Sequence, residues 1–234
     1  FLLSVWTHEP HLPIESAEEF MKPYSNIKDE GIRQHHGNIT QLDHAFGMIT
    51  KALDELGLRD NTIVFFTSDN GPEGRGNNGR TRGSTGGLRG RKRDSHEGGI
   101  RVAGMVRWPG RIMPGSVSDI PVIGSDIFST VLDITGIPLP DDRTIDGVSI
   151  IPAFDDNPVK RPVPLFWRTH IAPANSHAAL RVKEWKLISD KSFSRFQLYD
   201  IEKDWKEEND LASKEIAKLE EMKVIFFKVL KGIE

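Results

Sequence analysis

The sequence predicts an α/β fold followed by a small antiparallel sheet. Apolar residues at helical spacing between Ile32 and Leu56 lead through a short turn into the continuous apolar run 62–67, which together form half of a β-α-β unit. Beyond a proline-rich stretch, three short strand-like runs alternate with polar turns, which is typical of a meander. We therefore expect a partial α/β domain over residues 1–160 and a C-terminal sheet-and-helix subdomain over residues 161–234.

The first elements are an expected strand, a helix and a second strand. Residues 1–6 form a short apolar run that predicts a strand ending before two prolines. The helix carries one apolar face, and Gly57 predicts a left-handed stop at its end. The run 62–67 lacks polar alternation, so we expect a strand buried on both faces of a parallel sheet. The apolar face of the helix comprises Ile32, Ile39, Leu42, Phe46, Ile49, Leu53 and Leu56.

The later elements begin with a long loop. Residues 74–93 hold seven glycines and seven basic residues but no acid and no aromatic residue, which predicts irregular structure. A strand follows over 101–108, and Ser125 is expected to cap a helix that ends at Gly136. The remaining expected elements are strands at 178–182, 185–188 and 196–199 and a last helix from Ser213.

Composition limits the classes of partner. The chain has 234 residues, with 31 Lys and Arg against 34 Asp and Glu, so its formal charge of −3 favours no polyanion. No run approaches the roughly 18 apolar residues of a membrane helix, so we expect no membrane partner. Without cysteine, disulfides and thiolate metal sites are impossible within the chain.

Asp69 and Asn70 form the sharpest local signal for chemistry. They follow the run 62–67, and the carboxyl ends of strands are where open α/β sheets place their ligand sites. An Asp-Asn pair offers two hard oxygen ligands, which suit calcium or magnesium better than zinc. The alternative is an Asx turn that leads into Gly71 and Pro72.

His11 is a second candidate, because it lies between two prolines after the first expected strand. An imidazole there can donate to an anion or protonate a leaving group, and a surface histidine without function is the alternative. His8 is a weaker candidate on the same grounds.

The basic loop is a third candidate site. Arg89–Arg93 could hold an anionic group, with neighbouring glycines allowing the backbone to approach it. A solvated loop or a single-stranded nucleic-acid binder are the alternatives, but residues 74–93 contain no aromatic residue on which a base could stack. We therefore expect no nucleic-acid partner. Glu97 before a pair of glycines indicates a structural anchor for the loop.

Taken in order, these segments resemble the sulfatase family. The resemblance rests on blocks that cover nearly the whole chain: the histidine loop 10–13, the helix end and strand 53–71, the basic motif 88–92, the run 96–102, the helix and turn 126–147, and the C-terminal runs 179–188 and 198–200. It implies an α/β/α sandwich of the alkaline-phosphatase-like superfamily, of which this chain represents the C-terminal half with its small antiparallel subdomain.

The resemblance also implies roles for four residues. Asp69 and Asn70 would be ligands of a divalent cation, usually Ca²⁺ and alternatively Mg²⁺. Lys92 would contact the sulfate group, and His11 would contact the sulfate ester and act as acid toward the departing alcohol. A metal and a lysine suit this chemistry, because both stabilise charge that grows on the sulfuryl oxygens.

The implied activity is hydrolysis of sulfate esters of aryl or carbohydrate substrates, in a periplasmic, extracellular or lysosomal-type compartment. A phosphate or phosphonate ester hydrolase with the same metal site is the alternative within this superfamily. The family's formylglycine nucleophile arises from a Cys/Ser-x-Pro/Ala-x-Arg signature, which this sequence lacks. We therefore expect the nucleophile in a preceding segment and no turnover by this chain alone.

Two structural expectations follow from that interpretation. Apolar surface around 1–6 and 63–66 should be exposed, which favours a dimer or a retained N-terminal fragment as partner. His11 and Asp69 should lie within about 15 Å of each other if they share one small-ligand pocket.

Overall fold

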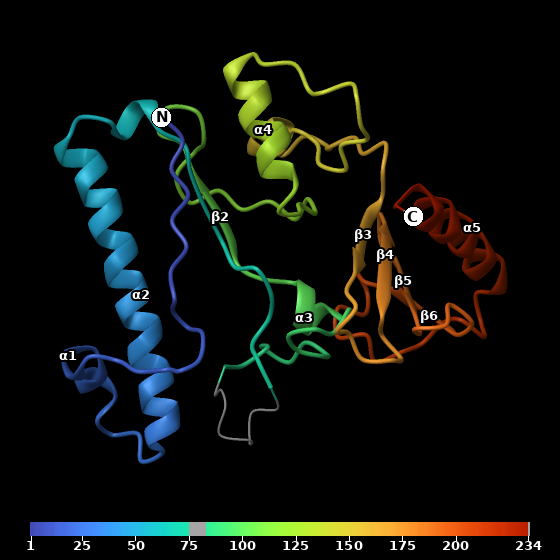
Figure 1. The fold of residues 1–234 in the computed structure, drawn as a ribbon, viewed down its shortest axis with the longest axis horizontal. Coiled ribbons are helices and arrows are strands. Elements are labelled where there is room, and N and C mark those ends of the chain that lie inside the picture. Colours follow the sequence, from blue (N-terminus) through green and yellow to red (C-terminus); the bar gives the residue numbers. More distant parts are fainter. Residues whose placement is uncertain (75–82, 234) are drawn as a thin grey trace.

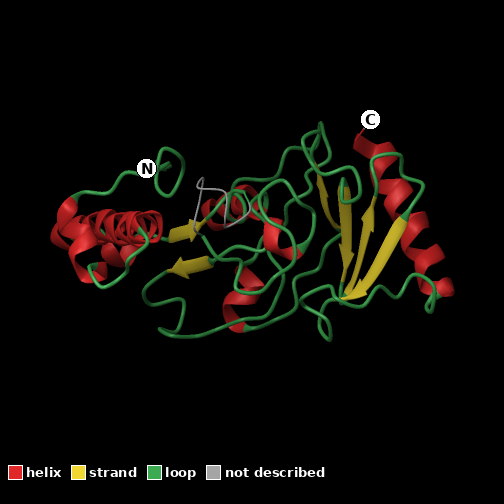
Figure 2. Cartoon of the chain, turned by 90° about the horizontal axis from the view of Figure 1, so that it is seen from below, coloured by secondary structure: helices red, strands yellow, loops and turns green. Residues whose placement is uncertain are grey.

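The computed structural model describes residues 1–74 and 83–233, which form two separate sheets with helices beside them. Figure 1 shows a long helix on one side, a two-stranded sheet near the middle and a four-stranded sheet with the C-terminal helix on the other side. In Figure 2 the two sheets again lie apart, joined mainly by irregular segments. The expected loop 74–93 lies partly outside the described residues, since 75–82 are not among them.

The N-terminal helical part is α1 (Glu18–Met21), the 3-10 turn η1 (Lys22–Tyr24) and the long helix α2 (Glu30–Glu55). Asp29 caps α2, because its side chain accepts a hydrogen bond from the Ile32 amide at 2.9 Å. The helix ends beside Gly57, whose φ of 66° is the left-handed conformation expected of a glycine stop. The 3-10 turn η2 (Arg59–Asn61) then leads into the first strand.

The first strand is β1 (Val64–Thr67), and it pairs antiparallel with β2 (Gly104–Arg107). The expectation of a parallel partner is wrong for this pair. Between the two strands, the described part of the chain contains only the one-turn helix α3 (Glu97–Ile100), not the long crossover helix that parallel pairing needs. Residues 63–66 are half-buried on this narrow sheet, and the Phe66 ring packs against Phe46 of α2 with centroids 5.2 Å apart.

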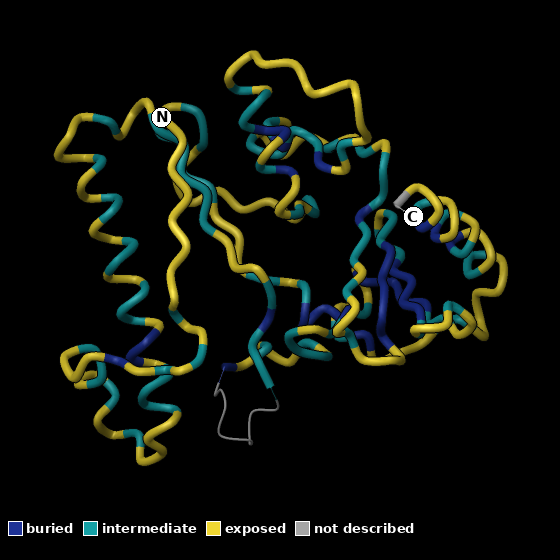
Figure 3. The backbone as a smooth tube through the Cα atoms, viewed as in Figure 1, coloured by how far each residue is buried: buried dark blue, intermediate teal, exposed yellow. Residues whose placement is uncertain are grey.

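Residues 1–6 are not a strand, which corrects the expectation for this run. They are extended and solvent-exposed (Figure 3), and Phe1 and Trp6 are 87% and 94% exposed. A strand requires a hydrogen-bonding neighbour, and no strand pairs with this run in the described residues. The expected exposure of its apolar surface is confirmed, whereas the run 63–66 is only partly exposed.

The middle of the chain is organised around α4 (Asp126–Thr135), which ends at Gly136 in the left-handed conformation as expected. Ser125 makes no capping hydrogen bond, so that expectation is wrong. Asp126, the first residue of α4, is fully buried, and its carboxylate accepts hydrogen bonds from the amides of Ile123 and Val148, which lie outside the helix. It also pairs with Arg161 at 2.5 and 2.8 Å. The 3-10 turn η3 (Ile151–Asp155) follows.

The C-terminal sheet is an antiparallel meander in the order β3-β4-β5-β6, and α5 (Ile216–Ile233) packs against it. The expected meander is confirmed, but β3 was missed and α5 begins three residues after Ser213. The strands are β3 (Leu165–Arg168), β4 (Ala178–Val182), β5 (Trp185–Ser189) and β6 (Phe196–Asp200). Most buried apolar residues of the described part of the chain lie here, and Figure 3 colours much of this sheet as buried. The main cluster comprises Ala178, Leu180, Leu187, Leu198, Met222, Phe226 and Leu230.

Phe226 should therefore control the stability of this subdomain. Its fully buried ring packs among Phe166, Phe193 and Phe196. Phe226→Ala is expected to lower the free energy of unfolding by about 3–5 kcal/mol, because it removes apolar burial and leaves a cavity. Chemical denaturation would measure the loss, with Phe227→Ala as the matched control, since its ring is 42% exposed on the same helix. Equal losses in both variants would contradict this account of the core.

Candidate active site at the end of strand β1

Asp69 and Asn70 lie directly after β1, as the sequence predicts. Asp69 is exposed, and its Oδ1 lies 3.5 Å from the Ser68 hydroxyl, which is a long contact that leaves the carboxylate able to bind a ligand. The Asn70 side-chain amide nitrogen donates to Gly71 O at 2.9 Å, so its amide oxygen is the atom that can coordinate a cation. Both residues thus present hard oxygen atoms at one strand end.

Three glycines allow chain segments to approach one another closely beside this strand end. A Cβ at Gly71 would lie 1.9 Å from Gly98 O, and a Cβ at Gly99 would lie 2.0 Å from Asp94 O, so neither position can hold another residue without moving the backbone. Gly98 has its own clash, at 2.4 Å from Gly90 O. Gly71 thus lets α3 approach the strand end, whereas Gly98 and Gly99 let α3 approach the loop 88–94.

Backbone hydrogen bonds tie the loop in place. The Gly71 amide donates to Gly99 O at 2.9 Å, and the Lys92 amide donates to Pro72 O at 3.0 Å. The structure thereby brings Lys92 against the segment that immediately follows Asp69 and Asn70. Three of the four predicted site residues therefore lie on adjoining segments.

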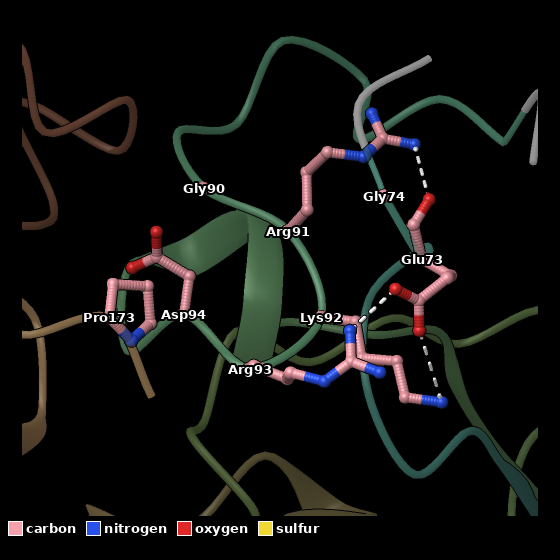
Figure 4. Close-up of a pocket in the computed structure, with 8 residues that line it drawn as sticks. All are labelled: Glu73, Gly74, Gly90, Arg91, Lys92, Arg93, Asp94 and Pro173. Atoms are coloured by element: carbon pink, nitrogen blue, oxygen red, sulfur yellow. Dashed lines mark hydrogen bonds and ion pairs between the residues drawn. The ribbon is translucent and has the colours of Figure 1, made fainter. Parts of the chain in front are cut away.

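The Lys92 side chain lines a pocket of about 370 Å³ together with Glu73, Arg91, Arg93, Asp94, Gly74, Gly90 and Pro173 (Figure 4). Lys92 Nζ lies 3.7 Å from Glu73 Oε2, and Arg93 Nη1 lies 2.5 Å from Glu73 Oε1. One carboxylate is therefore shared by two neighbouring cations. Sequence reasoning missed Glu73, although it lies four residues after Asp69 in the same turn.

Asp94 forms another wall of the pocket and is fixed by hydrogen bonds. Its Oδ1 accepts from the His96 amide at 3.0 Å and lies 2.6 Å from His96 Nδ1. Burial alone would raise the pKa of Asp94, but the hydrogen bonds from His96 outweigh it and hold the pKa below its ordinary value. Asp94 therefore stays ionised and positions the buried His96 ring.

A buried ion cluster anchors the loop to the C-terminal sheet. Lys186 of β5, fully buried, places Nζ 2.7 Å from Glu97 Oε1 and 2.8 Å from Glu207 Oε1. The Glu97 amide also donates to Glu207 Oε2 at 2.7 Å. The anchoring role expected for Glu97 is thus visible, whereas Lys186 and Glu207 were missed. The sequence signal for Lys186 is its position inside the apolar run 185–188, where a charged residue is unusual.

Arg89 adds a second connection to the same sheet. Its Nη1 donates to Tyr199 Oη and to Glu207 O, both at 2.9 Å. Burial raises the pKa of Tyr199 to about 12, so the phenol stays protonated and donates toward Gln197 Oε1 at 3.3 Å. Arg89 is therefore used to hold the loop rather than to face a ligand.

The contacts of His11 are local. Its amide donates to His8 O at 2.7 Å, and its exposed ring places Nδ1 2.8 Å from Leu12 O. Gln41 of α2 holds the neighbouring Glu9 by a 2.9 Å hydrogen bond. Contacts that join His11 to Asp69 are not seen among the described residues, so the expected convergence of these two stays a prediction.

The metal-binding capacity of the described residues is limited. No group of three or more His, Cys, Asp and Glu side chains gathers at one point within residues 1–74 and 83–233. Asp69 and Asn70 supply two oxygen atoms, whereas Ca²⁺ takes about six to eight. Their chemistry fits two ligands of a hard divalent cation. Within the same residues, no helix combines the length and apolar character needed to cross a bilayer.

Two family models match the chain. The model described as "Sulfatase" covers residues 1–137, and the model described as "N-sulphoglucosamine sulphohydrolase, C-terminal" covers residues 90–228. Among curated proteins, steryl-sulfatase of Rattus norvegicus is 45% identical over 117 residues, covering 49% of this chain and 20% of the relative. N-acetylgalactosamine-6-sulfatase of Homo sapiens is 35% identical over 150 residues, covering 61% of this chain and 26% of the relative.

Solved structures show the same fold. Ps i-CgsB, also solved in complex with k-i-k-neocarrahexaose, matches with a TM-score of 0.81 and 28% identity, covering 92% of this chain and 46% of that one. A Bacteroides thetaiotaomicron protein of glycosaminoglycan metabolism matches with a TM-score of 0.76 and 26% identity, over 95% and 48% of the two chains. The expected alkaline-phosphatase-like fold class is thereby confirmed. The chain spans about half the length of these structures and a fifth to a quarter of the two curated relatives.

The ion cluster at Lys186 generates a stability prediction. Lys186→Ala would leave the Glu97 and Glu207 carboxylates buried side by side without their shared cation. We expect a loss of about 3–5 kcal/mol in the free energy of unfolding, as for other broken buried ion pairs. Thermal and chemical denaturation would measure it.

Lys51→Ala is the matched control for that variant. Its ion pair with Glu55 spans 3.5 Å, and both side chains are exposed, at 75% and 65%. Exposed pairs contribute roughly 0–1 kcal/mol, so this variant should unfold almost as the unmodified chain does. A Lys186→Ala variant as stable as Lys51→Ala would show that the cluster does not anchor the loop.

Proposed function

Because this chain belongs to the sulfatase family, we propose that the whole protein is a sulfuric ester hydrolase acting on sulfated carbohydrates or aryl sulfates. The observation that carries the proposal is the position of Lys92, which is hydrogen-bonded through its backbone to the segment following Asp69 and Asn70. A cation beside two hard oxygen ligands at a strand end suits binding of an anionic ester. Sulfatases among the curated relatives support this reaction class.

In this proposal Asp69 and Asn70 hold a divalent cation, Ca²⁺ or alternatively Mg²⁺. When bound, that cation would withdraw charge from the sulfuryl oxygens. Lys92 contacts the sulfate group directly and stabilises the same oxygens by its own charge. Asp94, Glu73 and the glycine contacts hold the loop so that the Lys92 ammonium faces the pocket.

His11 is proposed as the acid that protonates the departing alcohol. Leu12 O can only accept a hydrogen bond, so the 2.8 Å contact requires a hydrogen on Nδ1. Nε2 is then the ring atom that exchanges a proton with the leaving oxygen. The exposed ring is accessible for this role.

The nucleophile is proposed to be a formylglycine in a part of the whole protein that this chain does not include. Sulfated carbohydrate or aryl sulfate is the proposed substrate, and the exposed apolar run 1–6 would pack on the remaining polypeptide or on a second copy. We place the whole protein in a periplasmic, extracellular or lysosomal-type compartment.

Replacing Lys92 in the whole protein tests the site. Lys92→Ala should lower the rate of aryl sulfate hydrolysis by about 10²–10³, because it removes a charge directed at the transferring group. Lys51→Ala, an exposed lysine on α2, is the control and should retain full activity. Unchanged hydrolysis by Lys92→Ala would overturn the assignment of Lys92 to the sulfate site.

Asp69→Ala in the whole protein should reduce both the amount of bound calcium, measured by equilibrium dialysis, and the rate of aryl sulfate hydrolysis.

The isolated chain provides a second test. With calcium present, residues 1–234 alone should not hydrolyse a chromogenic aryl sulfate, because the described candidates bind or protonate and none is an activated nucleophile. Calcium should bind weakly, since two ligands fall short of the usual coordination number of about six to eight. Turnover by this chain would refute the proposed location of the nucleophile.

A further inference from the structure

Arg93 lies beside Lys92 in an unusual backbone conformation. Its φ of 76° is in the left-handed region, which disfavours residues other than glycine. Such a conformation is sterically unfavourable for a residue that carries a Cβ atom. The Asp94 amide closes this turn by donating to Arg91 O at 2.8 Å. Outliers of this kind gather at functional sites, where the strain places a side chain.

The consequence of the turn is that two consecutive cations reach one carboxylate. In an extended strand, neighbouring side chains point to opposite faces. Here Lys92 Nζ and Arg93 Nη1 both approach Glu73, at 3.7 Å from Oε2 and 2.5 Å from Oε1, as Figure 4 shows. The charged residues that line the pocket are three cations, Arg91, Lys92 and Arg93, and two carboxylates, Glu73 and Asp94, which leaves a surplus of one positive charge.

Arg93 keeps binding capacity after pairing with Glu73. Its side chain is 41% exposed, whereas that of Lys92 is 18% exposed. A guanidinium has five N–H donors in a planar fork that matches an oxyanion. The pocket of about 370 Å³ lies within the range of small-molecule sites.

We propose that Arg93 is a specificity-determining residue that binds a second anionic substituent, sulfate or carboxylate, next to the ester held by Lys92. This inference rests on the proposed function and adds that the preferred substrate carries two acidic groups. Glu73 is the internal counter-ion that the second group displaces. Asp94 also lines the pocket and supplies an acceptor for a hydroxyl group, which suits a saccharide.

Binding measurements on the 234-residue chain test the proposal. The probes are inorganic sulfate, a monosulfated galactose, a disulfated galactose and a monosulfated galactose linked to glucuronate, titrated by NMR at constant ionic strength. We expect the unmodified chain to bind the dianionic probes about tenfold more tightly than the monosulfated one, as for a partly exposed charge-assisted pair. The two dianionic probes distinguish sulfate from carboxylate as the second group.

The variants test the role of Arg93 separately from the proposed function of the Lys92 site. Arg93→Ala should bind the dianionic probes and monosulfated galactose about equally tightly, with the affinity for monosulfated galactose almost unchanged. Arg93→Lys should restore part of the preference for the dianionic probes. Glu73→Gln should tighten binding of every anionic probe several-fold by removing the competing charge. Arg143→Ala, which removes another exposed arginine paired with an acid, should behave as the unmodified chain.

The possible failures are distinguishable. If Lys92→Ala binds sulfate and monosulfated galactose as well as the unmodified chain does, the proposed function of this site is wrong. If Lys92→Ala loses those probes but Arg93→Ala keeps the preference for two anions, only the role of Arg93 is wrong. If Arg93→Ala and Arg143→Ala weaken the binding of every probe equally, the effect comes from the loss of a positive charge anywhere on the surface. That result would also overturn the inference about Arg93.

Discussion

The buried ammonium of Lys186, shared by Glu97 and Glu207, is the interaction on which the arrangement of the candidate site depends. A charge in the protein interior is tolerated only when it is paired, and here each carboxylate lies within 2.8 Å of the ammonium. Two acids and one base leave one surplus negative charge. The Glu97 amide offsets part of that surplus by donating to Glu207 Oε2. Arg101 offsets another part, because its Nη1 lies 3.8 Å from Glu97 Oε2. The cluster therefore holds α3, and with it the loop that carries Lys92, in one position on the C-terminal sheet.

The opposite side of that loop is held by backbone contact instead of charge. Gly71, Gly98 and Gly99 let two chain segments approach more closely than any side chain would permit. Lys92 thus lies between a charged anchor on the sheet and a glycine contact at the end of β1. This double attachment explains how a loop rich in glycine can present two adjacent cations to one pocket. The strained backbone at Arg93 is compatible with stability because both sides are fixed.

Local features of the sequence predicted the parts of the structure that depend on local physics. Gly57, Gly136, the meander and the strand end at Asp69 and Asn70 follow from turn chemistry and apolar periodicity, and the structure contains them. Pairing partners are set by distant segments, so the antiparallel β1–β2 pair and the unpaired run 1–6 could not be read from their own residues. The role of Glu207 could not be predicted for the same reason, because its partner Glu97 is 110 residues away in the sequence.

That separation also determines when the loop can acquire its shape. Chain closure over 89 residues to Lys186 and 110 to Glu207 is entropically unfavourable until the C-terminal sheet has formed. During synthesis the segment carrying Lys92 leaves the ribosome long before its anchors do, while α2 relies on contacts made close by in the sequence. The pocket is therefore among the last parts of the chain to mature. Because Met222, Phe226 and Leu230 of α5 pack on the same sheet as Lys186, the order of the pocket also depends on the C-terminal helix.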